Sequence, residues 1–208
     1  MKKHLFIIIL IACSYVLSLL AIPFLPSEVA IHWNAAGEAD GFTNKWWGAL
    51  LFPLFLTGIT FLLIYLPKID PRKENYEKFK NVYLIFLHVL VIFFVILHVM
   101  TLAYNVGFSV QVDIVVPIGV GVLFIVLGNY MPKIKPNYFI GIRTPWTLDN
   151  ETVWQKTHRV GGKVFVMMGV LVMLTIFVES VWRFVLLLII VFGGTIYLFV
   201  QSYIFSRQ

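Results

Sequence analysis

The sequence has 208 residues, of which 60% are hydrophobic and only 12% are charged. Soluble domains carry charge on about 25% of their residues, so this composition excludes an ordinary soluble protein and predicts an all-α integral membrane protein. The net charge of +6 gives no reason to expect direct nucleic-acid binding, because the basic residues fall in separate loops and not on one helix face. The single cysteine, Cys13, excludes an intrachain disulfide.

Six apolar stretches are long enough to cross a bilayer. A helix rises about 1.5 Å per residue, so about 20 residues cross about 30 Å of hydrocarbon. The first stretch exceeds the apolar core of a signal peptide, which is about 7–15 residues, and no Ala-x-Ala cleavage pattern follows, so we expect it to remain as a helix. The predicted transmembrane helices cover residues 5–22, 47–66, 82–104, 112–131, 160–178 and 181–204.

The positive charges predict the orientation of these helices. When the amino terminus, with Lys2 and Lys3, is placed inside, all of the 16 lysines and arginines except Lys45 and Arg183 face the cytoplasm. We therefore expect six transmembrane helices with both termini cytoplasmic, in a multi-pass membrane protein.

This topology predicts two membrane domains, each with one large polar loop. Residues 1–81 form an amino-terminal two-helix domain with an outer loop at 23–46. Residues 82–208 form a four-helix domain with a cytoplasmic loop at 132–159.

A short sequence occurs twice at predicted cytoplasmic helix ends. Residues 65–71 read Tyr-Leu-Pro-Lys-Ile-Asp-Pro, and residues 130–136 read Tyr-Met-Pro-Lys-Ile-Lys-Pro. Duplication of a helical hairpin explains this repeat, and so does the ordinary use of lysine and proline where a helix stops.

The predicted outer loop combines aromatic, acidic and amide side chains, and three interpretations stay open. His32, Glu38 and Asp40 could offer one nitrogen and two carboxylates to a metal such as zinc, as a membrane enzyme would require. The loop could instead be a recognition surface for an extracellular ligand, or a structural cap anchored by interfacial tryptophans. Because no nucleophile–base pair accompanies these residues, we predict no enzymatic activity, no metal and no cofactor. The candidate ligand-binding residues are His32, Trp33, Asn34, Glu38, Asp40 and Trp46.

Two histidines, His88 and His98, lie within the third predicted helix. Their separation of about 15 Å along the axis prevents them from sharing one ligand. Intramembrane polar residues can carry protons, so a small transporter or exporter is the alternative function. No Asp, Glu, Lys or Arg lies in the middle of a predicted helix to complete a proton relay, which favours neutral histidines that hydrogen-bond between helices.

The predicted cytoplasmic loop leads into the fifth helix. Asp149 is expected to be the N-cap, and apolar positions then recur at helical spacing from Val153 to Val164. This pattern predicts an amphipathic start to the helix, with Trp154 at the lipid boundary.

The least generic part of the sequence lies in this loop. Gly141-Ile142-Arg143-Thr144-Pro145-Trp146-Thr147, together with Asn129, Glu151-Thr152-Val153-Trp154 and His158-Arg159, resembles the signature of the SdpI family of bacterial membrane proteins. The motif His32-Trp33-Asn34 and the run Gly37 to Trp46 resemble a small membrane domain of unknown function that often precedes that signature. The two resemblances cover nearly the whole chain.

The resemblance implies a six-helix protein that protects a bacterial cell against a secreted antimicrobial peptide. It also implies a receptor that signals to a cytoplasmic autorepressor, so the expected partners are the lipid bilayer, a toxin peptide and a transcriptional repressor. The residues that match the cytoplasmic signature are Asn129, Gly141, Arg143, Thr144, Pro145, Trp146, Trp154, His158 and Arg159.

Overall fold

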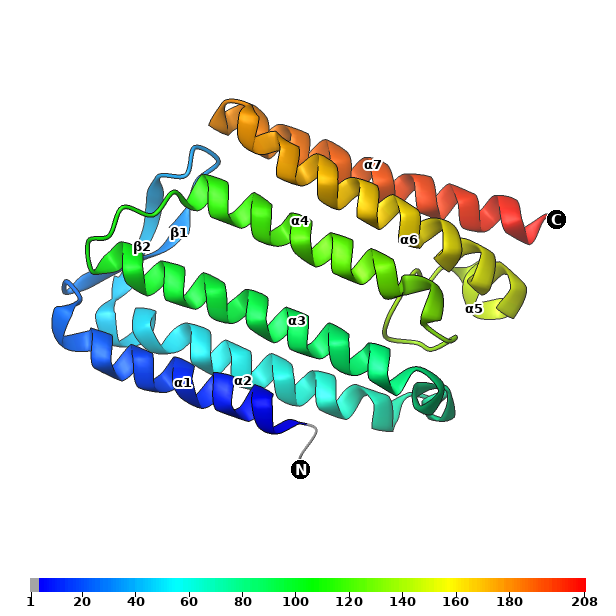
Figure 1. The fold of residues 1–208 in the computed structure, drawn as a ribbon, viewed down its shortest axis with the longest axis horizontal. Coiled ribbons are helices and arrows are strands. Elements are labelled where there is room, and N and C mark those ends of the chain that lie inside the picture. The colour runs from blue at the N-terminus through cyan, green and yellow to red at the C-terminus, as the bar shows by residue number, and fades with distance from the viewer. Residues whose placement is uncertain (1–3) are drawn as a thin grey trace. The chain divides into compact units, whose positions relative to one another are not determined.

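The computed structural model describes residues 4–208, so Lys2 and Lys3 lie outside the described residues. Within this range, six helices are long and apolar enough to cross a membrane, which confirms the predicted number (Figure 1). They are α1 (Leu5–Ala21), α2 (Lys45–Ile69), α3 (Lys73–Asn105), α4 (Val112–Tyr130), α6 (Glu151–Leu174) and α7 (Ser180–Ser206). The shorter helix α5 (Pro145–Asp149) lies between α4 and α6. The all-α membrane class is confirmed, and the orientation of the termini stays a prediction.

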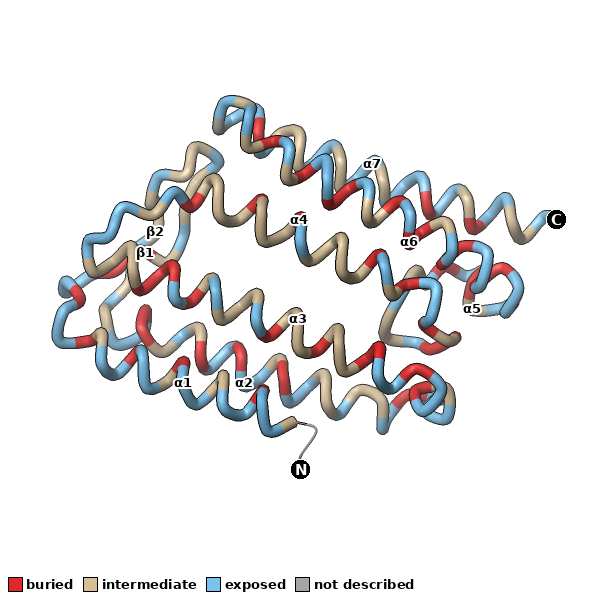
Figure 2. The backbone as a smooth tube through the Cα atoms, viewed as in Figure 1, coloured by how far each residue is buried: buried red, intermediate tan, exposed pale blue. Residues whose placement is uncertain are grey.

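Two helices extend beyond the apolar stretches. α3 begins at Lys73, and the non-helical backbone of Phe79, with φ −133° and ψ 23°, marks a kink near its start. α6 begins at Glu151, and its buried positions confirm the predicted amphipathic start (Figure 2). The prediction that Asp149 is its N-cap is wrong. Asn150 has this role, because its side-chain oxygen accepts from the backbone N–H groups of the next turn.

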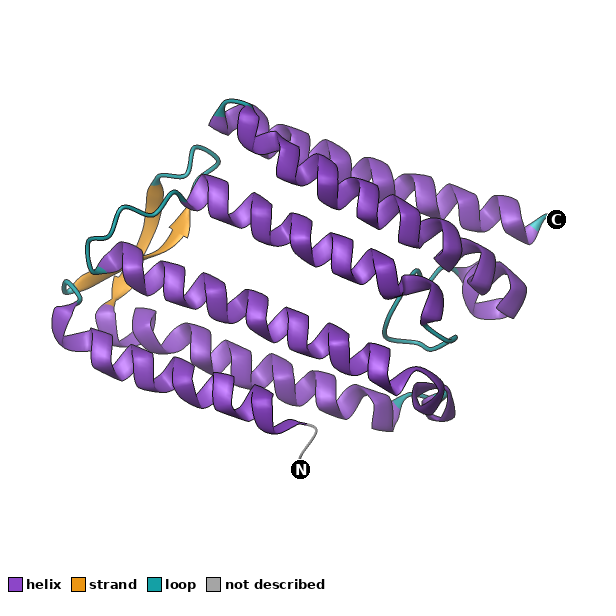
Figure 3. Ribbon diagram, in the orientation of Figure 1, coloured by secondary structure: helices purple, strands orange, loops and turns teal. Residues whose placement is uncertain are grey.

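A two-stranded sheet, which we did not predict, forms within residues 23–46 (Figure 3). Strand β1 (Glu28–Trp33) pairs antiparallel with β2 (Ala39–Asn44), and we call residues 28–44 the hairpin. Asn34 closes its turn, because its Oδ1 accepts from the N–H groups of Ala36 at 2.9 Å and Glu38 at 3.0 Å. Gly37 adopts a φ of 82°, a conformation that favours glycine. The strands are short, and apolar residues do not alternate with polar residues along β1, so the sequence lacked a clear strand pattern.

The chain forms two compact units, which we describe separately. Unit 1 comprises the chain up to Leu62 together with His88–Val116, and unit 2 comprises Leu63–Leu87 and Pro117–Gln208. Both units take residues from each side of position 81. The division into sequence domains 1–81 and 82–208 stays a prediction.

Unit 1 holds the hairpin against the helix ends. A buried core of Ile22, Leu25, Val29, Ala49 and Leu102 joins strand β1 to the ends of α1, α2 and α3. The side chain of Asn105, at the end of α3, imitates a neighbouring strand: its Oδ1 accepts from the N–H of Ala30 at 2.7 Å, and its Nδ2 donates to the Ala30 carbonyl at 2.9 Å. One side chain therefore satisfies both backbone groups of a buried strand residue.

The intramembrane histidines of unit 1 have packing roles. The hydroxyl of Ser18 donates to the Ala49 carbonyl at 2.6 Å, so its oxygen accepts from His98 Nε2 at 3.0 Å. This arrangement confirms the predicted hydrogen bonding between helices for His98. His88 stacks on Phe6, with ring centroids 5.7 Å apart.

In unit 2, glycines bring α4 and α6 into backbone contact. A β-carbon on Gly162 would lie 2.7 Å from the carbonyl oxygen of Gly128, and one on Gly121 would lie 2.7 Å from the carbonyl oxygen of Gly169. Small residues allow the two helix backbones to approach closely. The van der Waals contact that results stabilises the helix pair in a bilayer, where no hydrophobic effect drives helices together.

The turn between α6 and α7 is held by a buried arginine. Thr175–Phe177 forms a 3-10 turn, and α7 starts at Ser180, so α6 and α7 form a tight hairpin of helices. The Arg183 guanidinium donates to the carbonyls of Thr175, Ile176 and Val178 at 3.3, 3.2 and 3.1 Å. These bonds give partners to carbonyls at the carboxyl end of α6 and in the turn that follows it.

The glycine contact between α4 and α6 is open to test. We expect Gly162→Ala to lower the stability of unit 2 by about 1–3 kcal/mol, because its β-carbon meets a backbone oxygen that cannot rotate away. Gly193→Ala in α7 is the matched control, since its β-carbon would meet nothing within 4 Å. Thermal unfolding in detergent, followed by circular dichroism, compares the two. Equal unfolding temperatures would contradict the assignment.

Candidate functional site

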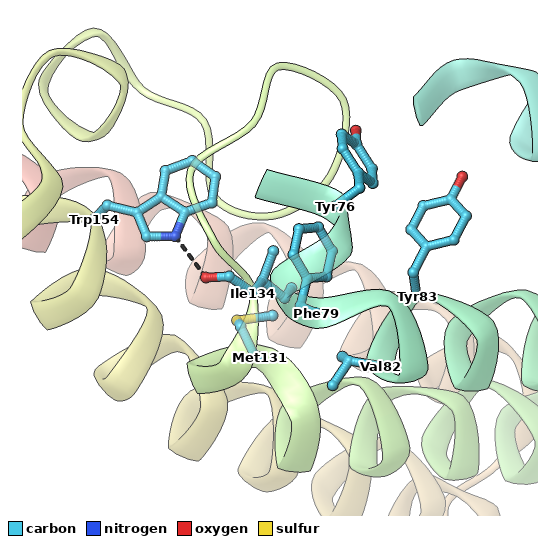
Figure 4. Close-up of a cluster of buried hydrophobic side chains, with 7 residues drawn as sticks. All are labelled: Tyr76, Phe79, Val82, Tyr83, Met131, Ile134 and Trp154. Atoms are coloured by element: carbon cyan, nitrogen blue, oxygen red, sulfur yellow. Dashed lines mark hydrogen bonds between the residues drawn. The ribbon is translucent and has the colours of Figure 1, made fainter. Parts of the chain in front are cut away.

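The signature residues lie in a folded segment of unit 2, residues 132–159, which we call the cap. Its centre is Trp154, which is 1% exposed and donates from Nε1 to the Ile134 carbonyl at 2.9 Å (Figure 4). The prediction that Trp154 sits at the lipid boundary is therefore wrong. The chain before α5 folds over the indole, and Trp154 joins a buried cluster with Tyr76, Phe79, Val82, Tyr83, Met131 and Ile134.

His158 is buried beside this indole and uses both of its ring nitrogens. Nδ1 donates to the Trp154 carbonyl at 2.8 Å, and Nε2 accepts from the Ile142 N–H at 3.1 Å, which fixes the neutral Nδ1–H tautomer. The two rings stack with centroids 4.0 Å apart. Gly141 is required here for two reasons: its φ is 107°, and a β-carbon would collide with His158 Nε2.

The Thr-Pro-Trp-Thr run builds the short helix α5. Thr144 Oγ1 accepts from the Thr147 N–H at 3.2 Å, and Thr147 Oγ1 accepts from the Thr144 N–H at 2.8 Å, which is a reciprocal capping box. Pro145 occupies the first turn, where its missing N–H costs nothing. Trp146 then packs its ring against Phe199 and Tyr203 of α7, at 5.1 Å from each.

A buried carboxylate that we did not single out from the sequence supports the cap. Asp70, at the junction of α2 and α3, is 2% exposed. Its Oδ2 accepts from the Tyr138 N–H at 2.9 Å and the Tyr76 hydroxyl at 3.0 Å, and its Oδ1 accepts from the Arg72 N–H at 2.7 Å. An acidic residue is unfavourable at the carboxyl end of a helix. The position of Asp70 just after α2 was therefore the one signal in the sequence that this carboxylate has a specific role.

Asn137 completes the same polar network and was also missed. It is fully buried, and its Oδ1 accepts from the N–H groups of Phe139 at 2.9 Å and Ile140 at 2.7 Å. The Tyr76 hydroxyl lies 3.2 Å from the same oxygen. Asp70, Tyr76 and Asn137 therefore tie the α2–α3 junction to the cap within unit 2.

Two arginines secure the outside of the cap. Arg72 donates from Nη2 to the Leu148 carbonyl at 2.7 Å and lies 5.0 Å from the Tyr138 ring centroid. Arg143 donates from Nη1 to the Tyr138 carbonyl. The repeated sequence at residues 65–71 and 130–136 does not account for these two arginine contacts. In each copy of the repeat, a lysine lies over the tyrosine ring of the same copy: Lys68 over Tyr65, and Lys133 over Tyr130.

Most signature residues thus take part in the packing and hydrogen bonds of the cap, and two do not. Asn129 bonds within α4, to the Ile125 carbonyl at 2.9 Å, and Arg159 is exposed on α6. The exposed cations of the cap and the adjoining turn of α6 give this surface a basic character; they are Lys133, Arg143, Lys156, Arg159 and Lys163.

The outer-loop candidates lie on the hairpin of unit 1 and at the start of α2. His32 Nδ1 and Asp40 Oδ1 are 2.5 Å apart across the strands, and both side chains are exposed. Glu38 is held in the turn by Asn34, with Nδ2 and Oε2 3.2 Å apart, and Trp33 packs edge-on against Tyr104. Trp46 is 55% exposed. Across residues 4–208, no three His, Cys, Asp or Glu side chains gather closely enough to hold a metal ion.

Comparison with known proteins matches both regions. Residues 133–201 match the SdpI/YfhL protein family, and residues 9–57 match a domain of unknown function, DUF1648. The chain is 28% identical over 208 residues to the immunity protein SdpI of Bacillus subtilis (strain 168), an alignment that covers 100% of this chain and 98% of that protein. No solved structure matches the chain.

The matched segments contain the structural features described above. The first includes nearly all of the cap, and the second includes the hairpin and the start of α2. The resemblance predicted from the signature residues is therefore confirmed: this chain is a multi-pass bacterial membrane protein similar to the SdpI/YfhL family.

Proposed function

We propose that this chain is an immunity protein that protects a bacterial cell against a secreted antimicrobial peptide. The observation that carries the proposal is its similarity, over its whole length, to a protein named as an immunity protein. No residue needs a catalytic role in this function, because an immunity protein can act by binding.

The hairpin is the surface that we assign to the peptide. It is predicted to lie outside the cell, where a secreted peptide arrives. It presents the exposed side chains of His32, Glu38 and Asp40 on a backbone that Asn105 anchors to α3. Anchoring lowers the conformational entropy lost on binding, which supports recognition by this surface.

The cap is the region that we assign to signalling on the opposite side. Its buried network holds the backbone of residues 137–142 in one conformation, and its exposed cations offer a basic surface to a cytoplasmic partner such as a transcriptional repressor. A rigid, charged surface suits protein recognition, where complementary charge sets specificity and association rate.

The transporter alternative receives less support from the intramembrane histidines. His98 is tied to Ser18, whose own hydroxyl is held by Ala49, and His88 is stacked on Phe6. These contacts give both histidines a packing role, and they favour the immunity proposal over a proton pathway.

The first expected outcome is protection of cells. A toxin-sensitive bacterial strain that expresses this chain should survive the killing peptide implied by the family resemblance better than the same strain with an empty vector. The measurement is colony survival over a range of peptide concentrations. Equal survival, with membrane insertion verified by fractionation, would contradict the proposed function.

The second expected outcome concerns the side of the membrane on which each region lies. In a Cys13→Ala background, a cysteine at Ala35 in the hairpin turn should react with a membrane-impermeant maleimide in intact cells. A cysteine at Gln155 in the cap should react only after the cells are opened. Both positions are exposed in the structure. The reverse labelling pattern would invert the topology and remove the hairpin from contact with an external peptide.

The third expected outcome tests whether the cap depends on Gly141. Gly141→Ala should destabilise the chain by about 1–3 kcal/mol, because it adds a clash with His158 to the strain of a positive φ. Gly107→Ala is the matched control, since Gly107 has a φ of 98° but open space around it. Thermal unfolding compares the two variants, and an equal loss in both would show that the contact with His158 has no energetic weight.

A further inference from the structure

Unit 1 contains an apolar groove of about 530 Å³ between α1 and α3. Leu17 and Leu20 of α1 form one wall, and Val99 and Ala103 of α3 form the other. The lining also includes Phe24 and Phe108, which follow the two helices and are 77% and 69% exposed. The groove therefore has aliphatic walls and an aromatic mouth.

The groove adjoins the hairpin. Leu102 lines the groove and also belongs to the buried core that contains Leu25 and, from strand β1 of the hairpin, Val29. Ala21 and Val106, which also line the groove, pack against the same core. The groove therefore adjoins the base of the hairpin, at the core that contains Val29.

The segments at this end of unit 1 are acidic. The exposed Glu28, Glu38 and Asp40 lie on the hairpin, and the side chain of Asp113 lies against Gly37 in its turn. In residues 23–46 and 106–113, the only Lys or Arg is Lys45. An apolar groove beside excess negative charge is complementary to a molecule that is apolar on one face and cationic on the other.

We propose that this groove binds the apolar face of a cationic amphipathic peptide, whose lysines or arginines lie against the hairpin carboxylates. The proposal rests on the proposed function, because it assigns a binding site to the secreted peptide. A phospholipid chain would also fit the aliphatic walls, but the phosphate of an anionic lipid would then face carboxylates of the same sign. Charge complementarity thus favours a cationic peptide over an anionic lipid.

The first experiment fills the groove. Ala103→Phe places an aromatic ring between the walls, and Ala12→Phe, on the exposed face of α1 and outside the lining, is the matched control. In the survival assay, Ala103→Phe should abolish protection, whereas Ala12→Phe should retain it at equal membrane levels. If the wild-type chain protects and Ala103→Phe protects equally, the groove proposal is overturned while the proposed function stands.

The second experiment does not depend on immunity. A photoreactive benzoylphenylalanine at position 108 of the full chain, in phosphatidylcholine nanodiscs, is irradiated with an amphipathic leucine/lysine peptide or its leucine/glutamate counterpart. The same group at the exposed Phe55 of α2 is the positional control. We expect adducts with the lysine peptide at position 108 in excess over position 55, and severalfold fewer in a Glu28→Gln, Asp40→Asn variant. Adducts with lipid only, equal adducts with both peptides, or equal adducts at both positions would each overturn the proposal.

Discussion

A backbone group that leaves regular structure and is buried away from water must find a partner inside the protein, because an unpaired buried N–H or C=O costs free energy. This constraint accounts for the non-helical parts of both units. Asp70 and Asn137 satisfy N–H groups of the cap, and Asn105 satisfies Ala30 in the hairpin. Arg183 satisfies the carbonyls that end α6. In each case one polar side chain allows a segment of irregular chain to remain beside a membrane helix.

The cap depends most strongly on this rule. Removing a partner from a buried donor costs about 1–3 kcal/mol, and Asp70 by itself accepts from two backbone N–H groups and a phenol. The stacked Trp154 and His158 add a second support, because the single ring N–H of Trp154 and both ring nitrogens of His158 bond to the backbone. The signature motif thus describes a folded cap, in which most of its residues take part in buried contacts.

The two regions that match known families have different chemistry. The hairpin of unit 1 is acidic and lies beside an apolar groove, whereas the cap of unit 2 is basic and filled by aromatic side chains. An immunity protein that both binds a peptide and signals needs one surface for each task. The function that we propose assigns the acidic surface to the peptide and the basic surface to the cytoplasmic partner.

Hydrophobicity and length, read from the sequence, determined the number and approximate extent of the membrane helices, because the thickness of hydrocarbon imposes both. The signature residues were also recognisable by local pattern. Only the tertiary structure decided what those residues contact: Tyr138 is 68 positions from Asp70, and Ala30 is 75 from Asn105. It also moved Trp154 from a predicted lipid boundary into a core, and it made a hairpin from a polar loop. Periodicity reports which face of an element is apolar, but the identity of a distant partner depends on how the elements pack.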